Sequence, residues 1–424
     1  MGQVKRPRLL PGREERALAA EMTSARRLFV LVLVAGAFVL DGYDLNSMAL
    51  VAPRLKDALG LDPTHFGLVF GIVTIGVGAG SALLAPWGDK FGRRSLIVAG
   101  CLFLAFATAG TATATTIPEF VVWRLLTGFG LGICLPNCTA LSAELAPAGA
   151  RATVMTLVSA GISLAALLAG MTAPNLIDWG GWQAMFWLPA AFAALVALLV
   201  WLVLPADLSK PVGLPGKELA KVPQLTLFRS PWLLPFAVFT GALLFNSLNL
   251  YMVNQWTPTL LPRAGFTIAE AQRQTGLQQG AGLVMGLLMS FLIDRWRPGM
   301  TMIGAFVLVA AAFIAIGVTE PDPTRWRWLL VVGAGFISGA AMALPALTAF
   351  LFPPNMVASA VGMGVLIARI GAFAGPLIGQ AMLTAGATPS QFLAAAALPA
   401  GIAAAICLAF PAALAVKRRE EAAT

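Results

Sequence analysis

Twelve stretches of about 20 predominantly apolar residues recur along this 424-residue chain. A run of this length crosses the hydrocarbon core of a bilayer as an α-helix. Only 11% of the residues are charged, against about a quarter in a soluble domain. The sequence therefore predicts an all-α membrane protein of twelve transmembrane helices. The predicted spans are 28–52, 64–86, 95–115, 118–141, 152–175, 183–204, 231–258, 271–293, 300–318, 326–350, 355–383 and 390–415.

An internal repeat divides these spans into two bundles of six. Residues 205–230, the longest internal polar stretch, are rich in Pro, Gly and Lys and are typical of a linker. Residues coincide when the chain is shifted by 205 positions, for example Gly36 with Gly241, Pro53 with Pro258, and Asp89 with Asp294. Parallel six-span repeats are typical of rocking transporters. The predicted parts are a basic tail (1–27), two six-helix bundles (28–204 and 231–415), the linker, and a C-terminal tail (416–424).

The distribution of basic residues predicts the orientation. Of the 28 Lys and Arg residues, 20 lie in the two tails and the loops on their side, and six lie in the opposite loops. The positive-inside rule therefore predicts that both termini are cytoplasmic. The basic N-terminal tail has no apolar core, so it is not a secretory signal. Because the positive charge is spread over short loops, we expect membrane lipid rather than nucleic acid as the partner.

Two carboxylates, Asp41 and Asp44, lie near the centre of the first span. A spacing of three places them on one helix face. Each would cost at least about 2.5 kcal/mol at that depth unless it faced a watery cavity, paired with a cation or held a proton. Their repeat partners are Asn246 and Asn249, which keep hydrogen-bonding capacity but hold no exchangeable charge. The sequence therefore assigns proton chemistry to the first half, and a cavity-shaping role to the two asparagines.

Two arginines also lie within spans. Arg124 is about two turns from one end of the fourth span, so it could extend to the interface, or face the cavity and pair with Asp44 or Asp41. Arg369 is near the middle of the eleventh span, where reaching the interface is difficult. No acid lies inside a second-half span, so its partner must come from the first half or from the substrate. A carboxylate would supply a bidentate counter-ion, which predicts a small anionic substrate.

The loop after the second span, residues 88–94, reads Gly-Asp-Lys-Phe-Gly-Arg-Arg. Its order resembles the signature of the major facilitator superfamily, in which this loop locks the cytoplasmic side of the outward-open state. A segment after the fourth span, from Glu144 to Arg151, resembles the one that docks on it. The resemblance implies gating roles for four residues, which could alternatively be ordinary helix-end charges: Asp89, Arg93, Glu144 and Arg151.

A closer resemblance is carried by three segments. Residues 41–44 read Asp-Gly-Tyr-Asp and resemble the Asp-Gly-x-Asp pattern of the aromatic acid:proton symporter family, as do segments 124–137 and 362–376. The resemblance implies proton-driven import of benzoate-type acids across a bacterial inner membrane. The site residues expected on all these grounds are Asp41, Asp44 and Arg124 for proton coupling, and Arg369, Asn137, Asn246, Asn249 and Tyr43 for substrate binding.

Two other functions remain open from the residues. A proton-coupled antiporter exporting drugs or organic acids would fit the fold, but the fifth span, between Gly161 and Pro174, lacks the Gly-x3-Gly-Pro-x2-Gly motif common in drug exporters. A sensor or membrane enzyme would need a soluble domain or a nucleophile–base or metal constellation, and the sequence offers none. We therefore expect a monomeric transporter with no catalytic or metal site, and with protons in place of a cofactor.

Overall fold

The structure, a computed structural model, describes residues 24–146, 151–204 and 224–423 and is entirely helical in these ranges, without strands. Twelve helical segments in them are long and apolar enough to cross a bilayer, in agreement with the prediction. The first half contains α2 (Ser24–Leu59), α3 (Gly67–Leu83), α5 (Arg93–Thr113), α6 (Ile117–Leu145), α7 (Arg151–Gly180) and α8 (Ala184–Val203). The second contains α9 (Leu233–Leu260), α10 (Ile268–Arg295), α11 (Pro298–Val318), α12 (Pro323–Ala343), α14 (Pro354–Thr384), and a final span of α15 (Pro389–Ala395), α16 (Ala397–Cys407) and α17 (Phe410–Ala423).

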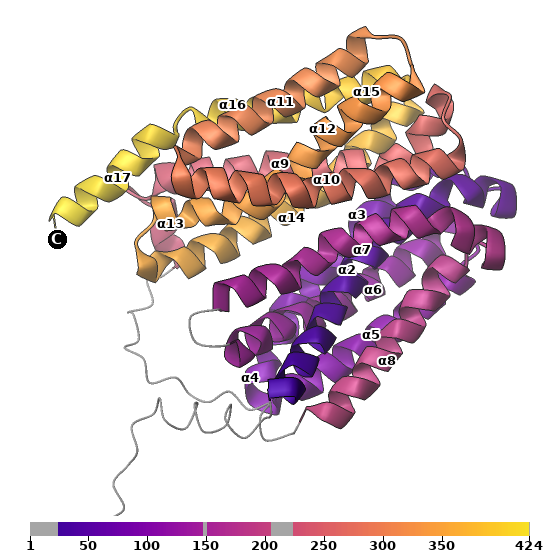
Figure 1. The fold of residues 1–424 in the computed structure, drawn as a ribbon, viewed down its shortest axis with the longest axis horizontal. Helices are drawn as coiled ribbons and strands as arrows, with labels where there is room; N and C mark the ends of the chain where they lie inside the picture. Colours follow the sequence, from indigo (N-terminus) through magenta and orange to yellow (C-terminus); the bar gives the residue numbers. More distant parts are fainter. Residues whose placement is uncertain (1–23, 147–150, 205–223, 424) are drawn as a thin grey trace, which may run out of the picture.

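The two halves form two bundles that lie side by side (Figure 1). Across their interface α7 packs on α10, α3 on α14, and α2 on α9. The first described residues of α2 and the end of α17 lie at the same end of the molecule, which we call the termini side. The bundles converge at the opposite end and separate toward the termini side (Figure 1).

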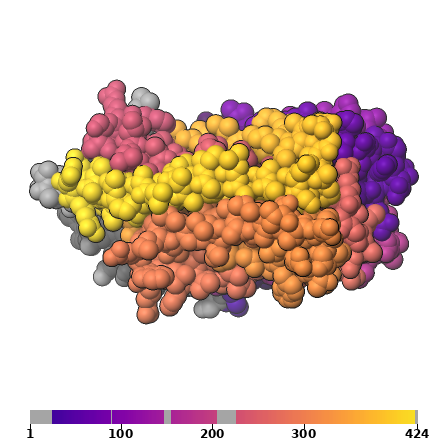
Figure 2. Space-filling view, turned by 90° about the horizontal axis from the view of Figure 1, so that it is seen from above, coloured from indigo at the N-terminus to yellow at the C-terminus, as the bar shows by residue number. Residues whose placement is uncertain are grey.

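The outer face of the second bundle is suited to lipid. Figure 2 shows α16 and α17 running along this face beside α11. Large apolar side chains on α11, on α16 and directly after α16 are exposed, among them Ile314, Leu398 and Leu408. Exposed apolar surface of this extent is expected where the solvent is a bilayer.

Some helices differ in length from the predicted spans. The first prediction ended before Pro53, but α2 continues through this proline to Leu59. Polar residues after Pro53 interrupt the apolar run without interrupting the helix. Likewise, most of the predicted C-terminal tail belongs to α17, because no glycine or proline interrupts it. Part of the predicted linker forms a short 3-10 helix, Gln224–Phe228; residues 1–23 and 205–223 lie outside the described ranges.

Close contact between α3 and α6 depends on Gly128 and Gly132 of α6. Their spacing of four residues in the sequence predicts that another helix approaches closely. A Cβ atom added to Gly128 would meet the carbonyl oxygen of Val73, and one added to Gly132 would meet that of Val77. Both obstacles are backbone atoms, which cannot move aside without displacing a helix. The core of the first bundle therefore tolerates no larger residue at these positions.

We expect Gly128→Ala to lower the midpoint of thermal unfolding, because overpacking costs about 1–3 kcal/mol. Gly78→Ala is the matched control: Gly78 lies in α3, and an added Cβ there meets nothing within 4 Å. Since alanine favours a helix by about 0.5–1 kcal/mol, the control should unfold at the same temperature or higher. Thermal unfolding of both proteins in detergent tests this. Equal shifts in the two variants would contradict the packing argument.

Candidate functional site

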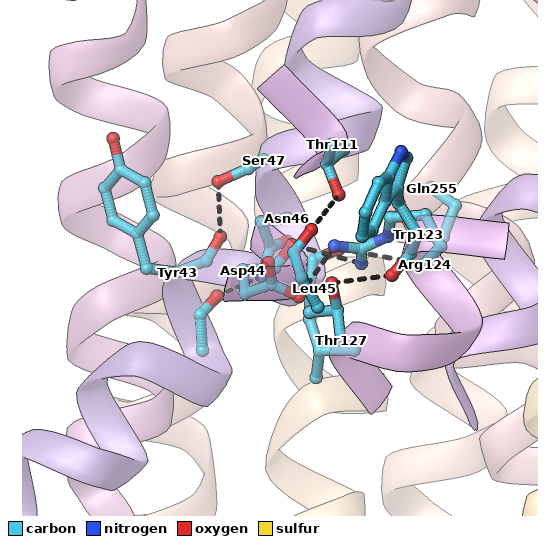
Figure 3. Close-up of polar contacts among 12 residues, drawn as sticks. Tyr43, Asp44, Leu45, Asn46, Ser47, Thr111, Trp123, Arg124, Thr127 and Gln255 are labelled. Carbon is cyan, nitrogen blue, oxygen red and sulfur yellow. Dashed lines mark hydrogen bonds and ion pairs between the residues drawn. The ribbon is translucent and has the colours of Figure 1, made fainter. Parts of the chain in front are cut away.

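A buried ion pair joins α2 to α6 at the centre of the first bundle. Nη1 of Arg124 donates to Oδ2 of Asp44 over 2.7 Å, and Nη2 donates to the Asp44 carbonyl oxygen over 3.3 Å. The two side chains are 1% and 2% exposed. Figure 3 shows the guanidinium of Arg124 pointing at Asp44. The arrangement neutralises two charges that would each be costly at this depth, although Oδ1 of Asp44 has no hydrogen-bond partner among the described residues.

One turn earlier on α2, Asp41 lies within reach of charges from both halves. It is 7% exposed and makes no hydrogen bond with a described residue. The charges of Arg369, Asp44 and Arg124 all act on it, that of Arg369 most strongly. Arg369 is partly buried and makes no hydrogen bond or ion pair within the described ranges. The second-half cation therefore lies within electrostatic range of the first-half acid, and no described residue occupies its donors.

Tyr251 of α9 belongs to the same group. Its phenol interacts electrostatically with both Arg369 and Asp41. The sequence prediction did not include it among the site residues. It lies in the unusually polar 246–256 segment of the seventh span, which is the one signal that could have indicated it.

A cavity of 430 Å³ lies between the two bundles. Its walls include Ser159, Ile162 and Ser163 of α7, and Leu250, Gln279 and Ser338 of the second half. Two neighbours connect it with the charged group, whose own side chains do not line it: the backbone of Ile162 packs against Gly42, which follows Asp41, and Leu250 precedes Tyr251 in the chain. The lining extends along α7 toward the termini side as far as Met155.

The bundles are in close contact on the side opposite the termini. Gly170 of α7 and Gly276 of α10 are so close that a Cβ atom on either would meet the other glycine. Two glutamines bridge the halves there by donating to backbone carbonyls of α2: Gln255 to Leu45 over 3.1 Å, and Gln272 to Leu50 over 2.8 Å. The cavity is therefore closed off at the end of the molecule opposite the termini, which we call the far side.

The other residues predicted to bind substrate have helix-packing contacts. Tyr43 lies on a different side of α2 from Asp44 (Figure 3), and its hydroxyl donates to the sulfur of Met185 over 3.4 Å. Asn246 donates to the carbonyl of Ile337 in α12. Asn249 donates to the carbonyl of Ala396, between α15 and α16. Asn137 donates to the carbonyls of Ile133 and Ala85, next to the loop after the second span. None of these four lines the cavity, so their contact with substrate stays a prediction.

Two of the four predicted gating residues meet at the termini side. Nη2 of Arg93 and Oε1 of Glu144 are 2.9 Å apart, which ties the start of α5 to the end of α6. Nearby, Arg94 donates to the carbonyl of Trp201 at the end of α8. The side chains of Asp89 and Arg151 lie outside the described part of the chain. The ion pair is located as gating would require, and the gating role itself stays a prediction.

Comparison with known proteins identifies similar transporters. The sequence profile of the Major Facilitator Superfamily matches residues 32–376. The gallate transporter of Pseudomonas putida is 28% identical over 91% of this chain and 92% of its own length. The 4-hydroxybenzoate transporter of Acinetobacter baylyi is 25% identical over 92% and 93%. A crystal structure of a bacterial homologue of the human lysosomal transporter Spinster, inward-facing and unoccupied, has a TM-score of 0.76 at 18% identity, covering 94% of this chain and 99% of that one.

Proposed function

Because this chain belongs to the major facilitator superfamily, we propose that it is a proton-coupled symporter that imports an aromatic carboxylate by alternating access. The observation that supports it best is the placement of Arg369, a partly buried cation whose charge acts on Asp41 of the other half more strongly than those of Asp44 and Arg124. The substrate class comes from the relatives, which are named as transporters of gallate and 4-hydroxybenzoate.

The charges of the site suggest the coupling ratio. Asp41, Asp44, Arg124 and Arg369 bring two negative and two positive charges into a low-dielectric region. A carboxylate that binds Arg369 adds one negative charge, and an unbalanced charge in such a place is costly. A proton on Asp41 restores the balance, whereas Asp44 already has a counter-ion. The transport step would therefore carry one proton with each monocarboxylate and no net charge.

The predicted orientation assigns a compartment to each side of the protein. With both termini in the cytoplasm of a bacterial inner membrane, as the basic loops predict, the closed far side is the periplasmic side. The structure then corresponds to an inward-facing state, in which Asp41 can release its proton and Arg369 its anion to the same compartment. Opening of the far side, by separation of α7 from α10 and α3 from α14, would give both groups access to the periplasm.

The test is uptake of radiolabelled 4-hydroxybenzoate into proteoliposomes. We expect accumulation when the external pH is lower than the internal pH, and its collapse to the equilibrium level with a protonophore. Because the proposed step carries no net charge, a potential imposed with potassium and valinomycin at equal pH should drive no accumulation. Liposomes without protein control for diffusion of the undissociated acid.

Three outcomes would overturn the proposal. Accumulation that needs sodium and resists the protonophore would exclude proton coupling. Accumulation driven only by the opposite pH gradient would indicate the exporter. Accumulation driven by membrane potential alone would exclude the one-to-one ratio.

A further inference from the structure

The side-chain amide of Gln279 lies in the cavity wall, and its oxygen accepts two hydrogen bonds. Oε1 of Gln279 accepts hydrogen bonds from Nδ2 of Asn254 over 3.1 Å and from Oγ of Ser338 over 2.8 Å. A carboxamide oxygen has two lone pairs, and both are thereby used. The three residues come from α9, α10 and α12, so three helices of one bundle fix the orientation of one side chain.

The other end of the same amide has no partner. Nε2 of Gln279 makes no hydrogen bond with a described residue, and Gln279 and Ser338 both line the cavity. Because the oxygen is turned toward α9 and α12, the amide presents its N–H groups to the cavity. The cavity thus contains a fixed donor on its wall, and Arg369, which does not line the cavity, is a separate donor group of the second half.

The other residues that line the cavity indicate which part of a ligand could accept a hydrogen bond from Gln279. Leu250 and Ile162 are apolar, as expected around an aromatic ring, and they adjoin Tyr251 and Gly42, next to the charged group. The lining on α7 also includes the hydroxyl groups of Ser159 and Ser163. A ligand whose carboxylate binds Arg369 would place its ring in this space. The position of Gln279 on the wall suits an oxygen attached to the ring rather than the carboxylate itself.

We infer that Gln279, oriented by Asn254 and Ser338, is a specificity-determining residue that donates a hydrogen bond to a ring oxygen of the substrate. The inference rests on the proposed function and goes beyond it by assigning the ring contact to one side chain. A ring without an oxygen would leave this donor unpaired in the occupied cavity, and unpaired buried donors are penalised. Hydroxylated benzoates should therefore be preferred over benzoate itself.

The experiment compares kcat/KM for uptake of 4-hydroxybenzoate and benzoate in proteoliposomes. In the wild type we expect a ratio of at least about 10, the effect of one hydrogen bond worth roughly 1.4 kcal/mol. Gln279→Met, which is similar in size and has no donor, should reduce the ratio to near one while benzoate uptake stays within about threefold of the wild type. Unchanged benzoate uptake also shows that the variant is folded.

Gln278→Met is the matched control. Gln278 precedes Gln279 on α10, is fully buried, makes no hydrogen bond with a described residue and does not line the cavity. This variant should keep the wild-type ratio. Ser338→Ala, which releases the amide oxygen of Gln279 on one side, should reduce the ratio partly.

The outcomes separate this inference from the function on which it rests. A Gln279→Met protein that transports both acids with the wild-type ratio, or loses both equally, would overturn the inference and leave the symporter intact. A wild-type protein that transports both acids with equal kcat/KM would also overturn it. A wild-type protein that takes up neither acid would remove the proposed function, and the inference with it.

Discussion

Asp44→Asn is expected to lower the stability of the folded protein by about 3–5 kcal/mol and to abolish proton-driven accumulation. The substitution keeps the shape of the side chain but removes the counter-ion of Arg124, whose guanidinium is 1% exposed and 2.7 Å from Oδ2 of Asp44. An uncompensated cation at this depth must either draw water into the bundle or displace α6 from α2. The midpoint of thermal unfolding and uptake of 4-hydroxybenzoate measure the two effects.

The double variant Asp44→Asn/Arg124→Gln separates charge from shape. It removes both charges and leaves two amides that can hydrogen bond, so it should be more stable than either single variant. It should still fail to accumulate substrate, since the charge arrangement around Asp41 is lost. If the double variant were no more stable than either single variant, mutual neutralisation of Asp44 and Arg124 would not explain why the pair is buried.

An exposed ion pair of the same chemistry serves as control. Arg54 and Asp178 are 3.6 Å apart on α2 and α7, with side chains 37% and 69% exposed. Exposed pairs contribute about 0–1 kcal/mol, so Asp178→Asn should change the unfolding midpoint little and leave uptake intact. A loss comparable to that of Asp44→Asn would show that burial is not what makes the Asp44–Arg124 pair important.

The features predictable from the sequence are those fixed by a single span. Apolar length determines the twelve helices, because a bilayer leaves a buried backbone no alternative. The cost of an isolated charge at mid-span predicts a partner for Arg124, which the structure identifies as Asp44 rather than Asp41. The spacing of Gly128 and Gly132 predicts close approach of another helix, which is α3. In each case one span predicts that a partner is needed, and the packing of the helices determines which partner it is.

The direction of Tyr43 around α2 can be predicted from the helix period. At 100° per residue, Asp41 and Asp44 are 60° apart, whereas Tyr43 is 100° from Asp44 and 160° from Asp41. Its contact with Met185 of α8 agrees with that geometry. The family pattern Asp-Gly-x-Asp favoured a shared role for neighbours in sequence, and the helix separates them.

Contacts that depend on two or more distant helices could not be predicted. Asn249 donates to Ala396, a carbonyl located where the last span breaks between α15 and α16. Asn254, Gln279 and Ser338, which are joined by hydrogen bonds, come from three helices. A single sequence specifies that such polar residues need partners, but which ones they meet depends on how six helices pack.

Arg369→Gln is expected to eliminate measurable uptake, and Arg369→Lys to reduce kcat/KM by roughly 10-fold to 150-fold. The estimate for lysine corresponds to about 1.5–3 kcal/mol for the loss of one hydrogen bond to a charged group. Glutamine removes the charge, so the site with two carboxylates would repel an anion. Lysine keeps the charge but loses the planar pair of donors that fits a carboxylate, so its effect should appear mainly in KM.

The comparison of these two variants tests charge and geometry separately. Arg325→Gln is the control, because Arg325 belongs to the same half, is exposed at the start of α12 and lies about 20 Å along that helix from Ser338, its first lining residue. It should transport like the wild type, which would exclude a general effect of lowering the positive charge. If Arg369→Gln kept a wild-type KM, the carboxylate would bind elsewhere. If Arg369→Lys matched the wild type in KM, Arg369 would act as a charge alone, without a two-point contact. The charge-balance argument for one proton per acid needs only the charge, so it would survive the second result and fail with the first.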